Sequence, residues 1–132
     1  RYGQYLSGRI AKGNKLKADL WIGIHTHADG LGGVFTHAGG HHVFYASAKE
    51  EAEMLNKHMS FLFPNEKNRG THNNPSSSYP IRYAELHQTN CPALISENFF
   101  FTNERECKLI LDSIEVIGQA HINFLHEWAQ NQ

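Results

Sequence analysis

Cys91-Pro-Ala-Leu-Ile-Ser-Glu-Asn-Phe-Phe-Phe-Thr-Asn103 is the stretch of sequence that decides the fold. Its apolar part, residues 92–95, is too short for a surface helix and predicts a buried strand that brings Glu97 to its carboxyl end. In open α/β sheets, ligands and catalytic groups gather at that end of the strands. Three phenylalanines follow Glu97 and are expected to wall the site, and Thr102 or Asn103 can then cap a helix. Glu97 is therefore a candidate general base or acid, and the alternative is that it pairs with an arginine.

A second apolar run, residues 20–24, leads directly into His25-Thr-His27. A continuous apolar run is typical of a strand that is buried on both faces. Residues i and i+2 of a strand point the same way, so both imidazoles should emerge on one side. Two histidines at the mouth of a buried strand indicate a metal or catalytic role. The alternative for each is a hydrogen-bonded structural histidine.

Helical periodicity is found on both sides of these strands. It predicts helices over residues 2–17, over residues 47–62 and from residue 104 to the end of the chain. Ser47 and Glu50 form a possible capping box at the start of the second helix. Strands that alternate with helices predict an α/β fold of three layers, with a mixed, mostly parallel sheet and helices on both of its faces.

The connecting segments are less regular. Residues 28–40 are rich in glycine and should form a loop at the rim of a binding site. His41 and His42 are expected to be solvated loop residues, with a short aromatic strand from His42 onwards. Residues 65–80 are polar and predict a loop, whereas residues 79–87 are compatible with a strand or with a short helix.

The composition limits the class of protein. A chain of 132 residues with a net charge of −1 and no run of lysine or arginine predicts one domain that does not bind nucleic acid. No apolar stretch approaches the roughly 20 residues that a membrane-spanning helix needs, so no membrane insertion is expected. The two cysteines do not have metal-site spacing. Ten histidines suggest a metal.

Two separated motifs resemble the family of zinc-dependent N-acetylmuramoyl-L-alanine amidases (amidase type 3). Residues 6–28 resemble a helix with an arginine and an asparagine, here Arg9 and Asn14, followed by a strand ending Ser-Ile-His-Ala-Asn-Ala, here Gly-Ile-His-Thr-His-Ala. Residues 92–103 resemble a strand ending Glu-x-Gly-Phe-x-Ser-Asn, here Glu-Asn-Phe-Phe-Phe-Thr-Asn. Residues 68–70 also match in position. The resemblance covers essentially the whole chain and implies a phosphorylase/hydrolase-like fold.

The resemblance implies a zinc hydrolase. His25 would be a ligand of Zn²⁺, and Glu97 would take a proton from the zinc-bound water and return it to the leaving amine. The implied substrate is peptidoglycan, cut between the lactyl group of N-acetylmuramic acid and the L-alanine of the stem peptide. Arg69 and Asn103 are the candidate substrate-binding residues. We further expect a bacterial or phage monomer that is secreted or acts in the cell envelope, in the periplasm or the cell wall.

The sequence also departs from this family. The Asp-Pro-Gly-His-Gly-Gly motif and the glutamate after it, which supply the other zinc ligands, have no counterpart in residues 1–132. We therefore expect a single catalytic amidase domain without its first strand and helix, and with its other ligands upstream of Arg1. His27 replaces an asparagine and Phe99 replaces a glycine, which should alter the local shape of the pocket. A weaker alternative is that His27, His41 or His42 supplies a substitute ligand.

Two other functions are compatible with the sequence. One is a metal-depleted, non-catalytic domain that binds the cell wall. The other is a carboxypeptidase-like zinc peptidase, for which Arg69 and Arg82 are candidates to bind a free carboxylate. For the hydrolase, the two strands should run parallel as neighbours, and His25 and Glu97 should face one cleft bordered by residues 28–40.

Overall fold

The computed structural model describes residues 5–132. Residues 2–4 of the helix predicted over residues 2–17 lie outside the described part. In chain order the elements are α1 (Leu6–Lys15), β1 (Trp21–His27), β2 (His41–Tyr45), α2 (Lys49–Leu62), β3 (Asn68–Asn73), α3 (Ala84–His87), β4 (Ala93–Phe100), α4 (Glu104–Asp112) and α5 (Ile114–Gln130).

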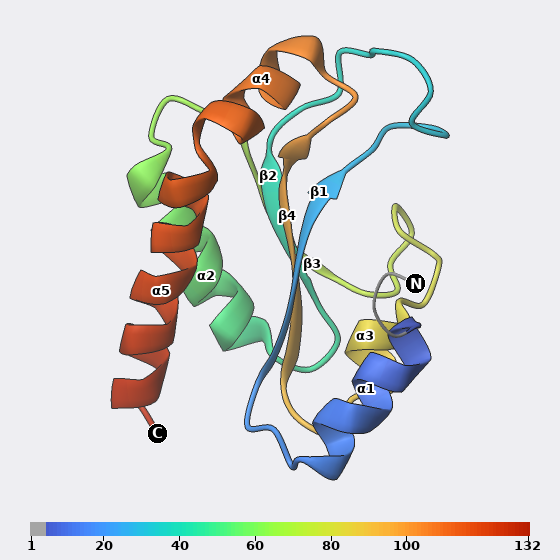
Figure 1. Ribbon diagram of the computed structural model, residues 1–132, viewed down its shortest axis with the longest axis vertical. Helices are drawn as coiled ribbons and strands as arrows, with labels where there is room; N and C mark the ends of the chain where they lie inside the picture. Colours follow the sequence, from blue (N-terminus) through green and yellow to red (C-terminus); the bar gives the residue numbers. More distant parts are fainter. Residues whose placement is uncertain (1–4) are drawn as a thin grey trace.

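The four strands form one mixed sheet in the order β1-β4-β2-β3. Strand β4 pairs in parallel with β1 and antiparallel with β2, and β2 pairs in parallel with β3. Helices α1 and α3 lie on one side of the sheet, and α2 and α5 lie on the other (Figure 1). The three-layer α/β fold with a mixed sheet is confirmed.

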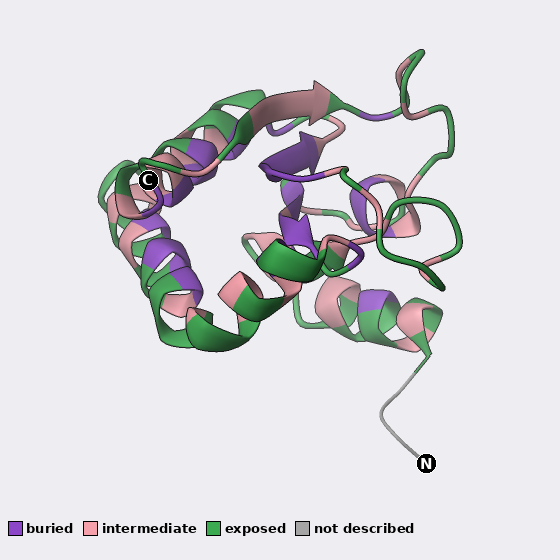
Figure 2. Ribbon diagram, turned by 90° about the horizontal axis from the view of Figure 1, so that it is seen from above, coloured by how far each residue is buried: buried purple, intermediate pink, exposed green. Residues whose placement is uncertain are grey.

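Each face of the sheet has its own apolar core. Leu94 of β4 packs with Val43, Leu55 and Phe124 between the sheet and helices α2 and α5. On the opposite face, Ile95 packs with a cluster that includes Phe44, Leu86 and Tyr83. Figure 2 shows the buried residues gathered on the central strands and on the inner side of the helix that ends at the C-terminus. Successive residues of β4 therefore alternate between two buried faces, as a continuous apolar run predicts.

Strand β1 differs from its prediction. Within residues 5–132 it pairs with β4 alone, so it is an edge strand of the described sheet. Ile24 is 59% exposed, and Gly23 is the only residue of β1 that is buried. The expectation of a strand buried on both faces is wrong for β1 in this structure, because the described chain places little against its outer edge.

The segments around β2 also correct the sequence analysis. His41 and His42 belong to β2 and are buried, so they are not solvated loop residues. Residues 68–73, expected in a loop, form strand β3 beside β2. The N-cap of α2 is Ala48 without a side-chain hydrogen bond, so the capping box at Ser47 is wrong. The sequence did not predict β3 because the residues of this strand are mostly polar. Polar residues are tolerated there because β3 lies at the edge of the described sheet.

The end of β4 contains a bulge. His25 pairs with Glu97 whereas His27 pairs with Phe100, so one extra residue is inserted into β4. Phe99 has a φ of 68°, in the left-handed region, and its buried side chain packs on the α5 side with Met59 and Ile117. A left-handed residue is what a bulge of this kind requires, and glycine adopts that conformation most easily. The bulge turns Phe99 away from the face that carries Glu97.

The helix after β4 begins as predicted. The side chain of Asn103 accepts a hydrogen bond from the backbone N–H of Glu106 and caps α4. In the described part of the chain, no helix is both long and apolar enough to cross a membrane.

Candidate functional site

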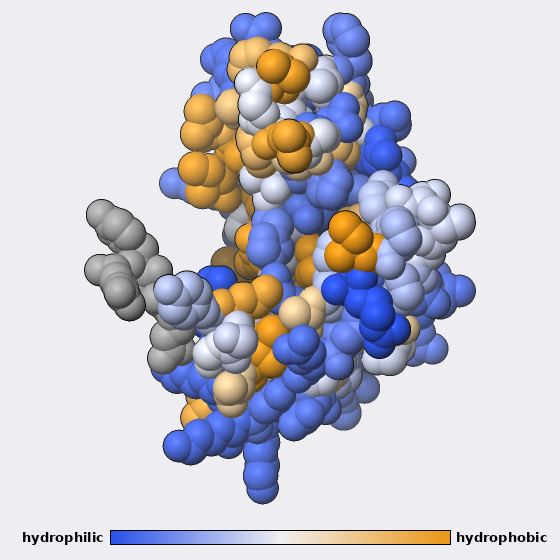
Figure 3. Space-filling model, turned by 90° about the vertical axis from the view of Figure 1, so that its right-hand side faces the viewer, coloured by the Kyte–Doolittle hydropathy of each residue, from blue (hydrophilic) through white to orange (hydrophobic). Residues whose placement is uncertain are grey.

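His25 and Glu97 lie opposite each other on the neighbouring parallel strands β1 and β4. Both side chains line one cavity of about 440 Å³, a size typical of small-molecule sites. This cavity opens on the side of the molecule that faces the viewer in Figure 3, between the loop over residues 28–40 and helices α1 and α3. The predicted placement of the two residues at one cleft is confirmed. The 28–40 loop contributes only Ala28 to its wall.

Glu97 is paired with a histidine. Nδ1 of His27 lies 3.3 Å from Oε1 of Glu97, and the carboxylate side chain is 13% exposed. Oε2 of Glu97 is buried and has no hydrogen-bond partner within residues 5–132. The alternative of an arginine partner is therefore wrong for the described chain, and one carboxylate oxygen is left free for a ligand or a proton.

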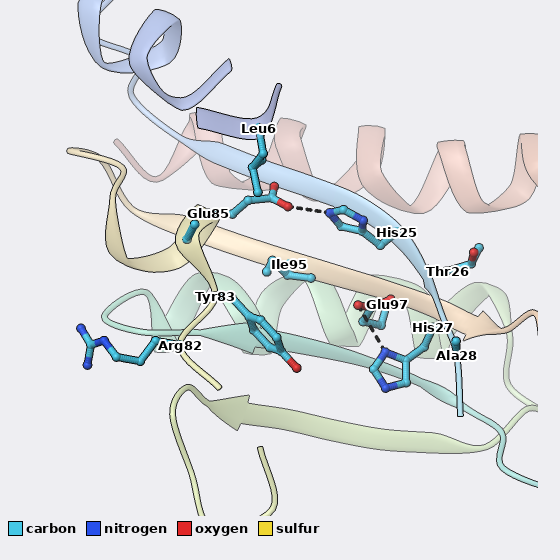
Figure 4. Close-up of a pocket in the computed structure, with 11 residues that line it drawn as sticks. Leu6, His25, Thr26, His27, Ala28, Arg82, Tyr83, Glu85, Ile95 and Glu97 are labelled. Atoms are coloured by element: carbon cyan, nitrogen blue, oxygen red, sulfur yellow. Dashed lines mark hydrogen bonds and ion pairs between the residues drawn. The ribbon is translucent and has the colours of Figure 1, made fainter. Parts of the chain in front are cut away.

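His25 is held by a residue that the sequence analysis missed. Its Nε2 lies 2.7 Å from Oε1 of Glu85, and Nε1 of Trp21 donates to Oε2 of the same carboxylate at 2.8 Å. Figure 4 shows the two pairs, His25 with Glu85 and His27 with Glu97, on the same cavity wall. His25 and His27 therefore share one side of β1, as predicted. The glycine in the apolar run, Gly23, was the available signal that another group approaches this strand closely.

The pair of His25 and Glu85 affects the protonation of both groups. The hydrogen bond to Glu85 raises the pKa of His25, although burial acts in the opposite direction. Burial pushes the pKa of Glu85 up, but the hydrogen bonds from His25 and Trp21 outweigh it and hold that pKa below its usual range. The contact is therefore a charge-assisted hydrogen bond whenever His25 is protonated.

One of the three phenylalanines, Phe100, packs beside His27, the histidine that is paired with Glu97. The ring of Phe100 lies 4.7 Å from the ring of His27, whereas Phe99 faces the opposite core and Phe101 is 40% exposed. The expectation that all three phenylalanines wall the site is wrong, because the bulge redirects Phe99. Tyr83 adds to the cavity wall, and burial together with the charge of Glu97 raises the pKa of its hydroxyl.

His42 lies beside the site without a polar partner. It pairs in register with Glu97, and its ring lies 5.0 Å from the ring of His27. Neither ring nitrogen has a hydrogen-bond partner in the described structure. Burial, followed by the neighbouring His27, His72 and Arg69, lowers the pKa of His42 to about 2. His42 is therefore a neutral aromatic residue of the sheet.

His41 points to the other face of the sheet. Its ring packs 5.6 Å from that of Phe99, and burial lowers its pKa to about 4. Within residues 5–132, no three His, Cys, Asp or Glu side chains are grouped so that they could hold a metal ion. The described structure therefore does not support His27, His41 or His42 as a substitute zinc ligand.

The two candidate substrate-binding residues lie outside the cavity wall. Arg69 donates to the carbonyl of Gly39 at 3.2 Å and lies over the ring of Phe100 at 5.3 Å. Asn103 caps α4 and donates to the carbonyl of Ala38. Arg82 does line the cavity, but Figure 4 shows its side chain pointing away from the two histidines.

A three-layer α/β fold brings a histidine and a glutamate to one cavity from neighbouring parallel strands, an arrangement that is compatible with a hydrolase that activates water. A family model described as N-acetylmuramoyl-L-alanine amidase matches residues 2–127. The chain belongs to this family, so it is a hydrolase of the kind that acts on an amide bond of peptidoglycan. No curated protein matches the chain.

Solved structures share the fold at low sequence identity. The N-acetylmuramoyl-L-alanine amidase AmiC2 of Nostoc punctiforme superposes with a TM-score of 0.79 and 20% identity, over 98% of this chain and 68% of that one. The catalytic domain of CwlV, an N-acetylmuramoyl-L-alanine amidase from Bacillus (Paenibacillus) polymyxa var. colistinus, superposes with a TM-score of 0.80 and 19% identity, over 98% of this chain and 68% of that one. An N-acetylmuramoyl-L-alanine amidase from Clostridium difficile 630 superposes with a TM-score of 0.74 and 24% identity, over 93% of this chain and 66% of that one. The chain thus spans about two thirds of the length of these structures.

Proposed function

We propose that this chain provides the catalytic carboxylate and one metal ligand of a zinc-dependent N-acetylmuramoyl-L-alanine amidase. The observation that carries the proposal is the register of β1 and β4, which sets His25 beside Glu97 on the wall of one cavity. The substrate would be the amide bond between N-acetylmuramic acid and the L-alanine of the stem peptide.

One side chain on the cavity wall, His25, is of a type that binds zinc, but the cavity wall does not supply a complete set of ligands. His25 is half-exposed at the cavity, and within residues 5–132 its hydrogen bond to Glu85 uses only Nε2. Imidazole nitrogen is a preferred zinc donor, and zinc sites use three or four protein ligands. The proposal therefore requires ligands in addition to His25, and the family resemblance assigns them to a histidine motif and a glutamate without counterpart in this sequence. A zinc ion bound there would polarise the amide carbonyl and lower the pKa of a bound water to about 7.

Glu97 would carry the proton in the reaction. Its Oε1 is held by His27, and its Oε2 is buried without a partner in the described structure. A carboxylate in that position can accept the proton of the attacking water and deliver it to the nitrogen of the leaving L-alanine. The Glu97 side chain is only 13% exposed, so the access of bulk water to this carboxylate is restricted.

The test uses two site variants of the full protein and one control. We expect Glu97→Gln to retain zinc while the hydrolysis of muropeptides falls by about 10²- to 10⁴-fold, because the base is lost. His25→Ala should lower the zinc content, because a ligand is lost. Glu53→Gln, on the exposed side of α2, should change neither quantity.

The outcomes separate the possible functions. Full activity in Glu97→Gln would refute the assigned base, and an unchanged zinc content in His25→Ala would refute the assigned ligand. Binding of peptidoglycan by the unaltered protein without release of L-alanine peptides would identify a non-catalytic wall-binding domain. We further propose that the protein acts in the cell envelope, because the proposed substrate lies there, and that it is a monomer.

A further inference from the structure

Arg82 brings a guanidinium group to the wall of the cavity that Glu97 also lines. Figure 4 shows its side chain at one end of the drawn wall, with the pair of His27 and Glu97 toward the other end. Arg82 is exposed, and none of the ion pairs within residues 5–132 includes it. An arginine side chain does not lose its proton in proteins. One end of the cavity therefore carries a permanent positive charge that no acidic residue of the described chain neutralises.

Hydrogen bonds hold this guanidinium at the cavity. Nη2 of Arg82 lies 3.0 Å from Nδ1 of His87, and Nε2 of His87 lies 3.1 Å from Oδ1 of Asn74. An arginine can only donate, so Nδ1 of His87 accepts and Nε2 carries the proton that is donated to Asn74. Asn74 is buried, and its side chain donates in turn to the carbonyl of Ile81 at 2.8 Å. A buried amide therefore orients His87, and His87 orients Arg82.

The acidic side chains of the cavity restrict where a ligand can place an anion. Glu85 and Glu97 both line the cavity, and a carboxylate close to them would be repelled. A guanidinium attracts a carboxylate and can bind it through two parallel hydrogen bonds. Within residues 5–132, the bond to His87 is the only hydrogen bond of the Arg82 side chain, so N–H groups remain for a ligand. The cavity therefore suits a ligand with a carboxylate at the Arg82 end and a neutral group beside Glu97.

We propose that Arg82 binds a free carboxylate of the stem peptide while the neutral amide bond to be cut lies beside Glu97. The inference rests on the proposed function, because it takes peptidoglycan as the ligand. A cavity of about 440 Å³ holds a ligand of small-molecule size, so the carboxylate belongs to a residue near the cut bond. The side chain of Arg82 points away from His25 and His27 (Figure 4), so this carboxylate is not next to the cut bond, as it would be in a carboxypeptidase substrate. The residue after L-alanine, a D-glutamate that continues the peptide through its γ-carboxyl, offers an α-carboxylate.

The test compares two ligands that differ by one charge. Both are N-acetylmuramoyl-L-alanyl-D-glutamate capped as the γ-methylamide, and one has a free α-carboxylate whereas the other has an α-amide. Their dissociation constants are measured by calorimetric titration of the full protein with Glu97→Gln, a substitution that should preserve the ligand during the titration. We expect the carboxylate form to bind about 10-fold more tightly, at the low end for a charged hydrogen bond because solvent screens an exposed arginine.

Two further variants assign this preference to Arg82. Arg82→Gln, made in the same background, should bind both ligands with equal affinity, because glutamine keeps a hydrogen-bond donor but has no charge. Arg105→Gln is the matched control, because Arg105 is also exposed but pairs with Glu66 and lies outside the cavity wall. It should keep the preference for the carboxylate form.

The outcomes separate this inference from the proposed function. Equal affinity for the two ligands with Arg82 in place, or an undiminished preference in Arg82→Gln, would overturn the role of Arg82. If the protein with Glu97 intact cleaves both ligands but does not distinguish them, the proposed function stands and only this inference is refuted. If the preference depends on Arg82 but neither ligand is cleaved when Glu97 is intact, the carboxylate site stands and the proposed function fails.

Discussion

Phe99 combines a buried aromatic side chain with a left-handed backbone, and the two effects can be separated by substitution. The ring is fully buried between Phe63, at a centroid distance of 5.1 Å, and His41, at 5.6 Å. Truncation of a buried phenylalanine to alanine costs about 3–5 kcal/mol of unfolding free energy. We expect Phe99→Ala to lose that amount.

The backbone reverses the usual order of alanine and glycine at this position. Alanine in the left-handed region costs about 1–2 kcal/mol, and the φ of 68° at Phe99 lies in that region. Glycine avoids this cost but loses about 0.5–1 kcal/mol through the entropy of the unfolded chain. The difference predicts that Phe99→Gly is more stable than Phe99→Ala by about 0.5–1 kcal/mol.

Urea denaturation of the full protein measures both variants, and Phe100 provides the matched control. Phe100 is also buried in β4 but is not among the residues with positive φ, so Phe100→Gly should be less stable than Phe100→Ala. A Phe99→Gly variant that is less stable than Phe99→Ala would refute the left-handed strain at the bulge.

Two further predictions concern buried polar groups. The folded protein holds His41 neutral, with its pKa lowered to about 4 by burial, whereas the unfolded chain binds a proton below about pH 6.5. The unfolding free energy should therefore fall as the pH is lowered from 6.5 to 4, by about 3 kcal/mol from this histidine, and should not fall further through His41 below pH 4. Urea denaturation across this range should show a smaller decrease in His41→Gln, and an equal decrease would contradict the assignment. The buried carboxylate of Glu106 accepts from the backbone N–H groups of Gly40 at 2.7 Å and Phe100 at 2.8 Å. In Glu106→Gln an amide N–H₂ must face one of these donors, so we expect a loss of about 1–3 kcal/mol in denaturation experiments, and an unchanged midpoint would show that these bonds do not contribute.

Local patterns in the sequence determined the framework of the site. The apolar runs before His25 and Glu97 predicted two neighbouring parallel strands, and the structure pairs these two residues in register. The helical stripe of α2 and the cap at Asn103 also follow from short-range spacing. These features could be predicted because strand alternation, helix periodicity and capping depend on residues close together in the chain.

Only the tertiary structure decided what surrounds that framework. Glu85 meets His25 from a position 60 residues away along the chain, and the exposed edge of β1 follows from its single pairing in the described sheet. The bulge sends Phe99 to the face opposite Glu97, whereas strict alternation would place residues 97 and 99 on the same face. Burial of His42 likewise depends on the rings that β1 and β4 place around it. The sequence could not show these features, because each depends on pairing register and on contacts between segments that meet only when the chain is folded.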